Sequence, residues 1–303
     1  MLLKKERNAP SVETFQRLNE GKHGVVQTYL YLVCGKRFSS HRRNKTTLTK
    51  HLWKTYVFGK QTIEQLSDQF SMDKRVVQKN LKQYKAPLKV HDPRHIHLVI
   101  DGTYFGERKE ETSWCAIVAR DPKQKEDLAW SFCDTEKTYE YMCVRQQLEQ
   151  LGYTILSVTA DGFSGIKSAF HGIPYQMCHV HIERLVIRGT TRNPQTEAGR
   201  VLLALVRTLH KNTKKHLFES SWTHEGVRQA FFCLKRHVPY LFTYKQNAHI
   251  PRTTNSLEGH FTHVKKVTDI HNGLSRQNKQ KLLHSIFLAS TISPDKKRLD
   301  EVL

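Results

Sequence analysis

The sequence has no run of 18 apolar residues, so no part of it predicts a helix that spans a membrane. Residues 1–6 lack the apolar core of a secretory signal peptide. No amphipathic basic anchor stands out, so a membrane surface is not the expected partner. The six cysteines have no framework spacing, which favours reduced thiols in an intracellular protein over a disulfide scaffold.

Acidic residues are scarce relative to basic ones. The 303 residues include 49 Lys or Arg and 28 Asp or Glu, which gives a net charge of +21. Such a surplus is typical of proteins that bind nucleic acid. Residues 1–90 carry 19 of the basic residues and only 6 of the acidic ones. Because phosphate neutralisation dominates non-specific binding, we expect this part to supply much of the affinity for DNA.

The chain is long enough for about two domains, with the boundary expected near residue 90. Ala86-Pro87 and Asp92-Pro93 interrupt the sequence there, and proline disfavours a continuing helix. Before this boundary, residues 1–24 are polar and are expected to be mobile. The charged residues 291–303 are expected to form a frayed tail.

Residues 25–50 resemble part of a zinc ribbon. The run from Cys34 to Phe38 has the composition of a ribbon's second knuckle. A ribbon needs four ligands, usually two CxxC pairs, but Tyr31 stands at the position of the partner cysteine. The next cysteine is Cys115. We therefore expect a degenerate ribbon that holds no zinc.

Residues 51–90 predict a helix-turn-helix domain. Thr62 and Gln65 have the spacing of a capping box, and Ser71 is placed to cap a second helix. Two short helices around a tight turn are the pattern of this motif. The alternative is a plain helical hairpin with a solvated basic face. The residues expected to contact DNA from the second helix are Lys74, Arg75, Gln78, Lys79 and Lys82.

Two short apolar runs, at 97–100 and 155–160, are each followed by Asp-Gly. Such runs, rich in β-branched residues, predict strands. If these strands are parallel neighbours, Asp101 and Asp161 lie side by side, and two close carboxylates repel unless a cation lies between them. Oxygen ligands suit Mg²⁺ or Mn²⁺. The alternative is that each Asp simply ends a strand in an Asp-Gly turn.

The elements between the two aspartates support that adjacency. Residues 113–119 and 128–133 predict strands that form an antiparallel meander with the first strand, and residues 139–151 predict a helix. This order is typical of an RNase H-like fold, in which the crossover helix makes the first and fourth strands parallel neighbours. A fifth strand is expected over 175–181.

The predicted fold is therefore α/β: an RNase H-like, mixed five-stranded sheet preceded by the small helix-turn-helix domain. This catalytic domain is expected to span residues 91–290. Residues of about 190–250 have mostly helical apolar spacing and predict a helical insertion into it.

Four further residues are candidates for the same site. Cys178 and His181 have the CxxH spacing of half a zinc site, but no second half is near, so we expect them to support the carboxylates without binding metal. Glu258 lies in the first turn of a predicted helix and is the candidate third carboxylate. Asn255 is expected to support it. The alternative is that Asn255 and Glu258 merely cap a helix N-terminus.

Basic residues follow on that last helix. Lys265 and Lys266 are placed to meet DNA phosphates.

As a set, these motifs resemble the DDE transposases of the Mutator-like superfamily, in particular bacterial insertion-sequence members with a variant zinc-binding N-terminus. The likeness covers residues 25–290 and rests on Asp-Gly at 101, Asp-Gly-Phe at 161, CxxH at 178 and Thr-Thr-Asn-Ser-Leu-Glu-Gly at 253. It implies that Asp101, Asp161 and Glu258 hold two Mg²⁺ ions. One ion would activate water or a 3′-hydroxyl, and the other would stabilise the leaving oxygen.

The resemblance also implies a biological setting. The enzyme would cut double-stranded DNA at terminal inverted repeats and join the 3′ ends to target DNA. Pairing two ends implies a homodimer, and the insertion-sequence relatives imply the bacterial cytoplasm and nucleoid. The alternatives are a non-catalytic helix-turn-helix regulator, a decayed transposase copy, and another RNase H-like nuclease such as a junction resolvase.

Overall fold

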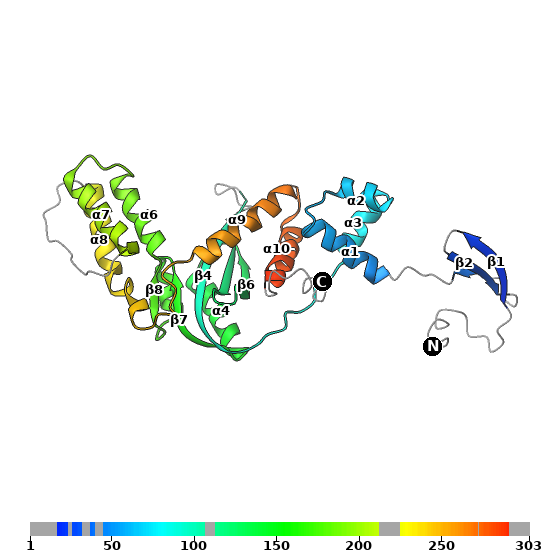
Figure 1. The fold of residues 1–303 in the computed structure, drawn as a ribbon, viewed down its shortest axis with the longest axis horizontal. Coiled ribbons are helices and arrows are strands. Elements are labelled where there is room, and N and C mark those ends of the chain that lie inside the picture. The colour runs from blue at the N-terminus through cyan, green and yellow to red at the C-terminus, as the bar shows by residue number, and fades with distance from the viewer. Residues whose placement is uncertain are drawn as a thin grey trace. The chain divides into compact units, whose positions relative to one another are not determined.

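The structure is a computed structural model that describes residues 17–23, 26–31, 37–39, 45–106, 113–211, 225–271 and 273–290. Side chains of residues 17–46 and 209–211 are outside this description. The chain divides into two compact units, Met1–Tyr84 and Lys85–Leu303 (Figure 1).

The first unit opens with a three-stranded antiparallel sheet. Its strands are β1 (Arg17–His23), β2 (Val26–Tyr31) and β3 (Arg37–Ser39), in that order. β1 falls in the segment expected to be mobile. It pairs with β2 from Arg17↔Tyr31 to His23↔Val26, so main-chain hydrogen bonds order a strand whose polar side chains gave no apolar signal. Cys34 lies outside the described residues, so the ribbon prediction stays a prediction.

Three helices follow: α1 (Lys45–Val57), α2 (Ile63–Phe70) and α3 (Lys74–Gln83). They pack through a small core to which Leu52, Leu66, Val77 and Leu81 contribute. Trp53 of α1 also stacks on Tyr84, with ring centroids 4.9 Å apart.

The turn between α2 and α3 is partly as predicted. The capping box at Thr62 is present, with the Gln65 amide donating to Thr62 Oγ1 over 3.3 Å. The prediction that Ser71 caps α3 is wrong, because Ser71 closes α2 in the left-handed region at φ 49°. Asp73 caps α3 instead, and its Oδ1 accepts a 2.7 Å hydrogen bond from the Arg75 amide.

The second unit is built on a five-stranded mixed sheet with the order β6-β5-β4-β7-β8. β4 pairs antiparallel with β5 and parallel with β7, so the prediction that the first and fourth strands are parallel neighbours is confirmed. The last strand ends earlier than predicted, at Met177. The strands are β4 (His95–Phe105), β5 (Trp114–Asp121), β6 (Glu126–Cys133), β7 (Thr154–Ala160) and β8 (Tyr175–Met177).

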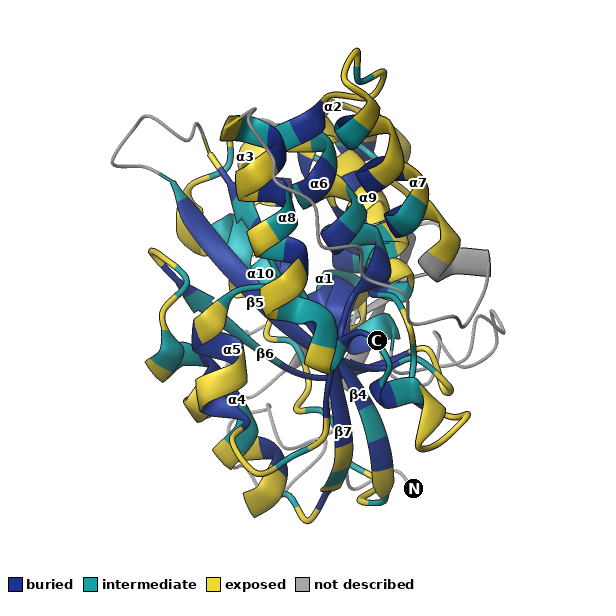
Figure 2. Cartoon of the chain, turned by 90° about the vertical axis from the view of Figure 1, so that its left-hand side faces the viewer, coloured by how far each residue is buried: buried dark blue, intermediate teal, exposed yellow. Residues whose placement is uncertain are grey.

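Helices cover both faces of this sheet. The crossover helix α4 (Thr138–Gln150) packs with α5 (Ser164–Ala169) on one face, against Leu98, Ile100 and Val158. On the other face lie α9 (Asn255–Ile270) and α10 (Arg276–Ser290). Figure 2 shows buried residues along the strands and exposed ones on the outer side of α4.

Between β8 and α9 the chain is helical. α6 (His179–Thr190), α7 (Glu197–Lys211) and α8 (Glu225–His237) pack on one another and are followed by two short 3₁₀ turns, Val238–Tyr240 and Thr243–Lys245. The insertion therefore begins near residue 179, before the predicted start. None of the helices within the described residues is both long and apolar enough to cross a membrane.

Candidate active site at the edge between β4 and β7

The pairing of β4 with β7 brings the two aspartates together. Val99 lies opposite Thr159 in the parallel register, so Asp101 and Asp161 follow at the same level two residues later. Leu98 and Ile100 belong to the core beneath α4, so by the alternation of a strand Asp101 points to the opposite face, toward α9.

The two Asp-Gly pairs differ in structure. Asp161 directly follows β7, and its Oδ1 accepts a 2.9 Å hydrogen bond from the Phe163 amide, as in a turn. Asp101 lies inside β4, which continues to Phe105, so the expectation that both aspartates end strands is wrong for Asp101. Because β7 stops at Ala160 while β4 goes on, no strand of the described residues lies beside β4 on that edge after Asp101.

Gly102 lies within β4 rather than in a turn, and neighbouring side chains leave no room for a side chain at this position. Its φ is not positive, but a Cβ placed on it would lie 1.6 Å from Glu136 Oε1 and 3.1 Å from Cys115 Sγ. A Cβ on Gly162 would lie 3.1 Å from the His237 ring, at the end of α8. Neither glycine could gain a side chain without moving a neighbour that faces the aspartates.

Asp101 occupies an electrostatically crowded position. Its pKa is raised to about 7, first by burial and then by the charges of Asp161 and Glu136, against the opposing effects of His181 and the Gly102 amide. That amide donates to Asp101 Oδ1 over 2.9 Å. A divalent cation would favour the ionised form and relieve the repulsion, so the donor set of Asp101 and Asp161 fits Mg²⁺ or Mn²⁺.

Cys178 and His181 lie at the start of α6, not on the expected fifth strand. The amide and hydroxyl of Thr254 donate to Cys178 Sγ over 3.3 and 3.4 Å. The pKa of the Cys178 thiol is lowered. Burial raises this pKa, but hydrogen bonds with His181 and Thr254 lower it by more. Burial lowers the pKa of His181, but its interactions with Cys178, Asp101 and Asp161 raise it, and the net change is upward. This cluster holds the imidazole of His181 beside the carboxylates.

Glu258 is held differently from the aspartates. It lies in the first turn of α9, as predicted, and Arg184 of α6 binds both its oxygens, with Nη1–Oε1 2.8 Å and Nη2–Oε2 2.9 Å. His181 Nε2 lies 3.6 Å from Glu258 Oε1. Within the described part of the chain, no three His, Cys, Asp or Glu side chains are close enough to hold a metal ion together. Glu258 could join an ion at Asp101 and Asp161 only by releasing Arg184.

Asn255 is exposed at the first position of α9. The capping-box alternative does not hold, because Thr254 is the N-cap residue and makes no side-chain capping bond. Its hydroxyl is instead directed at Cys178 and His181. The segment before α9 is tied to β7 by a 2.7 Å hydrogen bond from Thr159 Oγ1 to the Pro251 carbonyl.

Sequence reasoning missed Arg184, Glu136 and His237. Arg184 could have been found, because it follows His181 by three residues on a helix and so shares its face. Glu136 and His237 carried no local signal, since each reaches the aspartates only through tertiary packing.

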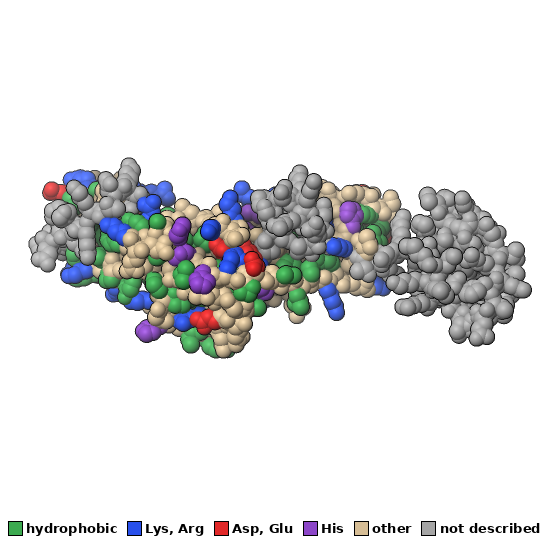
Figure 3. Space-filling view, turned by 60° about the horizontal axis from the view of Figure 1, so that its bottom comes forward, with side chains coloured by type: hydrophobic (Ala, Val, Ile, Leu, Met, Phe, Trp, Pro, Cys, Tyr) green, Lys and Arg blue, Asp and Glu red, His purple; other side chains and the backbone are tan. Residues whose placement is uncertain are grey.

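The basic residues predicted to contact DNA lie on the surface. All five residues predicted for α3 are exposed, as are Lys265 and Lys266 on α9. On the face drawn in Figure 3, basic side chains are spread widely and acidic ones are confined to small patches.

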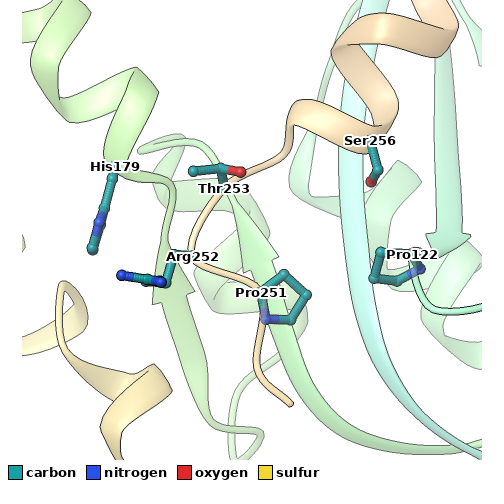
Figure 4. A pocket seen from close by; sticks show the side chains of 6 residues that line it. All are labelled: Pro122, His179, Pro251, Arg252, Thr253 and Ser256. Atoms are coloured by element: carbon teal, nitrogen blue, oxygen red, sulfur yellow. The ribbon is translucent and has the colours of Figure 1, made fainter. Parts of the chain in front are cut away.

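A pocket of about 430 Å³ lies beside the start of α9 (Figure 4). Arg252 and His179 lie together on one side of it, and Ser256 and Pro122 on the other. His179 is buried and its Nε2 is 2.7 Å from the Leu241 carbonyl oxygen, so its role is structural. The residues that line the pocket are Pro122, His179, Pro251, Arg252, Thr253 and Ser256.

Comparisons with known proteins identify no family. No protein-family model and no curated protein matches the chain. One similar solved structure is the simian T-cell lymphotropic virus intasome in complex with PP2A regulatory subunit B56 gamma. The likeness is 15% identical, covers 57% of this chain and 73% of that chain, and has a TM-score of 0.22. A score this low supports no inference about this chain.

Proposed function

We propose that this protein is a metal-dependent enzyme that cuts and joins DNA strands, a DDE transposase of an insertion sequence with an RNase H-like catalytic domain. The observation that carries the proposal is the placement of Asp101, within β4, beside Asp161, directly after the parallel strand β7, with Asp101 on the face covered by the helix that bears Glu258. The strand order of the sheet, with three antiparallel strands, a crossover helix and a parallel fourth strand, supports the RNase H-like assignment.

Asp101 and Asp161 would hold Mg²⁺ or Mn²⁺, with Glu258 joining them when it leaves Arg184. A bound ion supplies Lewis-acid activation of a phosphate and of the attacking hydroxyl. His181 lies beside the carboxylates, with its Nε2 3.6 Å from Glu258 Oε1, and Cys178 and Thr254 orient its ring. Arg184, exposed and already bidentate on a carboxylate, is suited to take a DNA phosphate in exchange, because the two anions share the same bidentate geometry.

The remaining parts of the proposal concern DNA. α2 and α3 would form a helix-turn-helix whose basic face on α3 enters the major groove, and Lys265 and Lys266 would contact phosphates near the cut. A homodimer would pair the two ends of the element.

One observation favours a different function. Arg184 neutralises Glu258, and the described residues form no ready three-ligand metal site. A non-catalytic DNA-binding protein, or a transposase copy that has lost activity, would show this arrangement.

Strand cleavage separates these functions. A labelled duplex carrying the end of the element is incubated with the protein in Mg²⁺ or Mn²⁺, with Asp161→Asn and the control Asp134→Asn, whose side chain is 78% exposed. We expect metal-dependent cuts from the wild type and the control, and none from Asp161→Asn, with DNA binding kept. Binding without cutting by the wild type would support the regulator, and cutting without joining to a target would indicate another nuclease.

A further inference from the structure

His237 is the last residue of α8 and lies beside the residue that follows Asp161. A Cβ on Gly162 would lie 3.1 Å from both Cε1 and Nε2 of the His237 ring, so the imidazole packs directly on the backbone at this point. The residue is half-buried, and among the residues that the structure describes neither ring nitrogen has a hydrogen-bond partner. A polar ring with unsatisfied nitrogens therefore lies next to a candidate catalytic carboxylate.

A second contact joins the same two segments. Lys167 of α5 meets Tyr240, which ends the 3₁₀ turn after α8. Its Nζ lies 3.8 Å from the centroid of the Tyr240 ring and donates a hydrogen bond to the Tyr240 hydroxyl. The Tyr240 ring packs edge-on against Tyr175, with centroids 5.8 Å apart, and the Tyr175 hydroxyl donates to the Asp161 carbonyl oxygen. These contacts hold the ammonium group of Lys167 near the end of β7.

The cations gathered here have no anionic partner. Lys167 and Arg236 are both exposed, and neither forms an ion pair with an Asp or Glu that the structure describes. Elsewhere in the same unit, Arg94, Arg145 and Arg276 each bind a carboxylate. The cluster at α5 and α8 is therefore free to take an anion from outside the chain.

Helix ends explain part of this arrangement. Lys167 lies in the last turn of α5, and Arg236 and His237 lie in the last turn of α8, where cations offset the partial negative charge of a helix end. That effect does not require two helices to bring their cations to one place. Burial lowers the pKa of His237, as do the charges of Arg236 and Lys167, whereas the charge of Asp161 raises it. Like charges this close repel unless an anion lies between them.

We propose that Lys167, Arg236 and His237 form a phosphate-binding cluster, which holds the backbone of the DNA strand beside Asp161. Ammonium, guanidinium and imidazole groups donate hydrogen bonds to phosphate oxygens, and contacts of this kind position a nucleic acid without reading its bases. The inference rests on the proposed function, because it names where the DNA backbone lies next to the same aspartates. It adds contacts on the β7 side of the site, whereas the lysines already predicted there lie on α9.

The test is binding of the labelled duplex by the full chain in the absence of divalent metal, measured by fluorescence anisotropy over a salt series. Lys167→Gln/Arg236→Gln removes two charges and keeps side chains of similar length. Each phosphate contact contributes about 0.9 to the slope of log K against log salt. We therefore expect the slope of this double variant to be shallower than that of the wild type by about 2.

Arg188→Gln/Arg228→Gln is the matched control. It removes the same charge from two exposed positions in the same unit. These positions lie at the opposite end of α8 from His237, where α8 meets the end of α6: a Cβ on Gly189 would lie 2.5 Å from the Gly226 carbonyl oxygen. We expect the control to keep the wild-type slope.

Two further measurements separate charge from structure. The exchange Lys167→Arg/Arg236→Lys keeps both charges and should keep the wild-type slope. Thermal melting checks that each variant remains folded. The single variants Lys167→Gln and Arg236→Gln should each make the slope shallower by about 1, so either one still tests the inference if the double variant fails to fold.

Strand cleavage distinguishes the two possible failures. If the wild type cuts DNA in Mg²⁺ or Mn²⁺ and the double variant keeps the wild-type slope, the phosphate cluster is overturned and the proposed function stands. A control that loses as much slope as the double variant also overturns the cluster. If only the double variant loses slope but the wild type cuts nothing, the cluster stands and the proposed function falls. A wild type that does not bind the duplex overturns both.

Discussion

The candidate site has a sheet side, formed by β4 and the end of β7, and a helix side, formed by the start of α9. The two sides balance their negative charges in different ways. On the sheet side, Asp101 and Asp161 lie at the same level beside each other, and the pKa of Asp101 is raised by burial and by the charge of Asp161, with His181 acting in the opposite direction. On the helix side, Glu258 already has Arg184 on both oxygens. Under the proposed function, the sheet side would take a cation from solution, whereas the helix side would release Arg184.

The two sides are also anchored differently. Main-chain pairing of β4 with β7 fixes the aspartates, so their spacing does not depend on any one side chain. The position of α9 depends on Asp127, which is fully buried. Arg120 and Ser290 donate to its oxygens, and His260 Nε2 lies 2.8 Å from Oδ2, an ion-pair distance without hydrogen-bond alignment. His260 is two residues after Glu258, so this network orients the helix that carries the third carboxylate.

Removing the anchor of the helix side should have the largest effect. Asp127→Ala leaves Arg120 buried without its partner and frees α9 and α10 from β6, so we expect a loss of about 3–5 kcal/mol in the free energy of unfolding. Urea denaturation measures it. Asp134→Ala, which removes only an exposed pair with Arg276, serves as the control and should change stability by less than about 0.5 kcal/mol. Equal losses in the two variants would show that Asp127 does not anchor the helix side.

The sheet side should instead become more stable when a carboxylate is removed. The pKa of Asp101 is about 7 in the fold and 3.8 in its ordinary state, so ionising it opposes folding. Wild-type stability contributed by the protonated group is full below pH 3.8 and is lost as the pH rises through 7. Without divalent metal, Asp101→Asn should exceed the wild type by a few kcal/mol at pH 8 and match it near pH 4.

Denaturation curves across this pH range provide the measurement, and Mn²⁺ should restore the stability of the wild type but not of Asp101→Asn. A difference between the two chains that stays constant with pH would contradict the crowding of the sheet side.

Replacing Arg184 should separate the contributions of the two sides to Mn²⁺ binding, followed by the electron paramagnetic resonance signal of the free ion. Arg184→Ala frees Glu258 for the ion, so we expect Mn²⁺ binding to tighten several-fold while cleavage is kept or lowered by poorer phosphate contact. Because Arg184 is half exposed, its loss should cost no more than about 1 kcal/mol of stability. Arg188→Ala, on the same helix and exposed, is the control. Weaker Mn²⁺ binding in Arg184→Ala would mean that Arg184 supports the site rather than competing for Glu258.

The smallest effect is expected outside the unit that contains the two aspartates. Lys79→Ala or Lys82→Ala on α3 should weaken DNA binding and reduce the slope of log K against log salt by about 1 each. Mn²⁺ affinity should not change, because neither residue belongs to the unit that holds the carboxylates. Fluorescence anisotropy over a salt series gives the slope. An unchanged slope would remove α3 from the DNA interface.

Local patterns in the sequence were sufficient for much of this architecture. Apolar runs with β-branched residues marked β4 and β7, and the helix between them implied a right-handed crossover that makes the two strands parallel neighbours. The adjacency of Asp101 and Asp161 follows from that order. The spacing of apolar residues likewise placed Glu258 in the first turn of α9. These features depend on periodicity and chain order, which a single sequence contains.

Other features depended on contacts between distant segments. The sequence alone could not show that β4 continues past Asp101, that Arg184 closes on Glu258, or that Gly102 is small because Glu136 fills its space. Contacts between side chains of distant segments are set by tertiary packing, and packing produces no periodic pattern in the sequence. The sequence by itself therefore determined which carboxylates are neighbours, and only the tertiary structure decided how their charges are balanced.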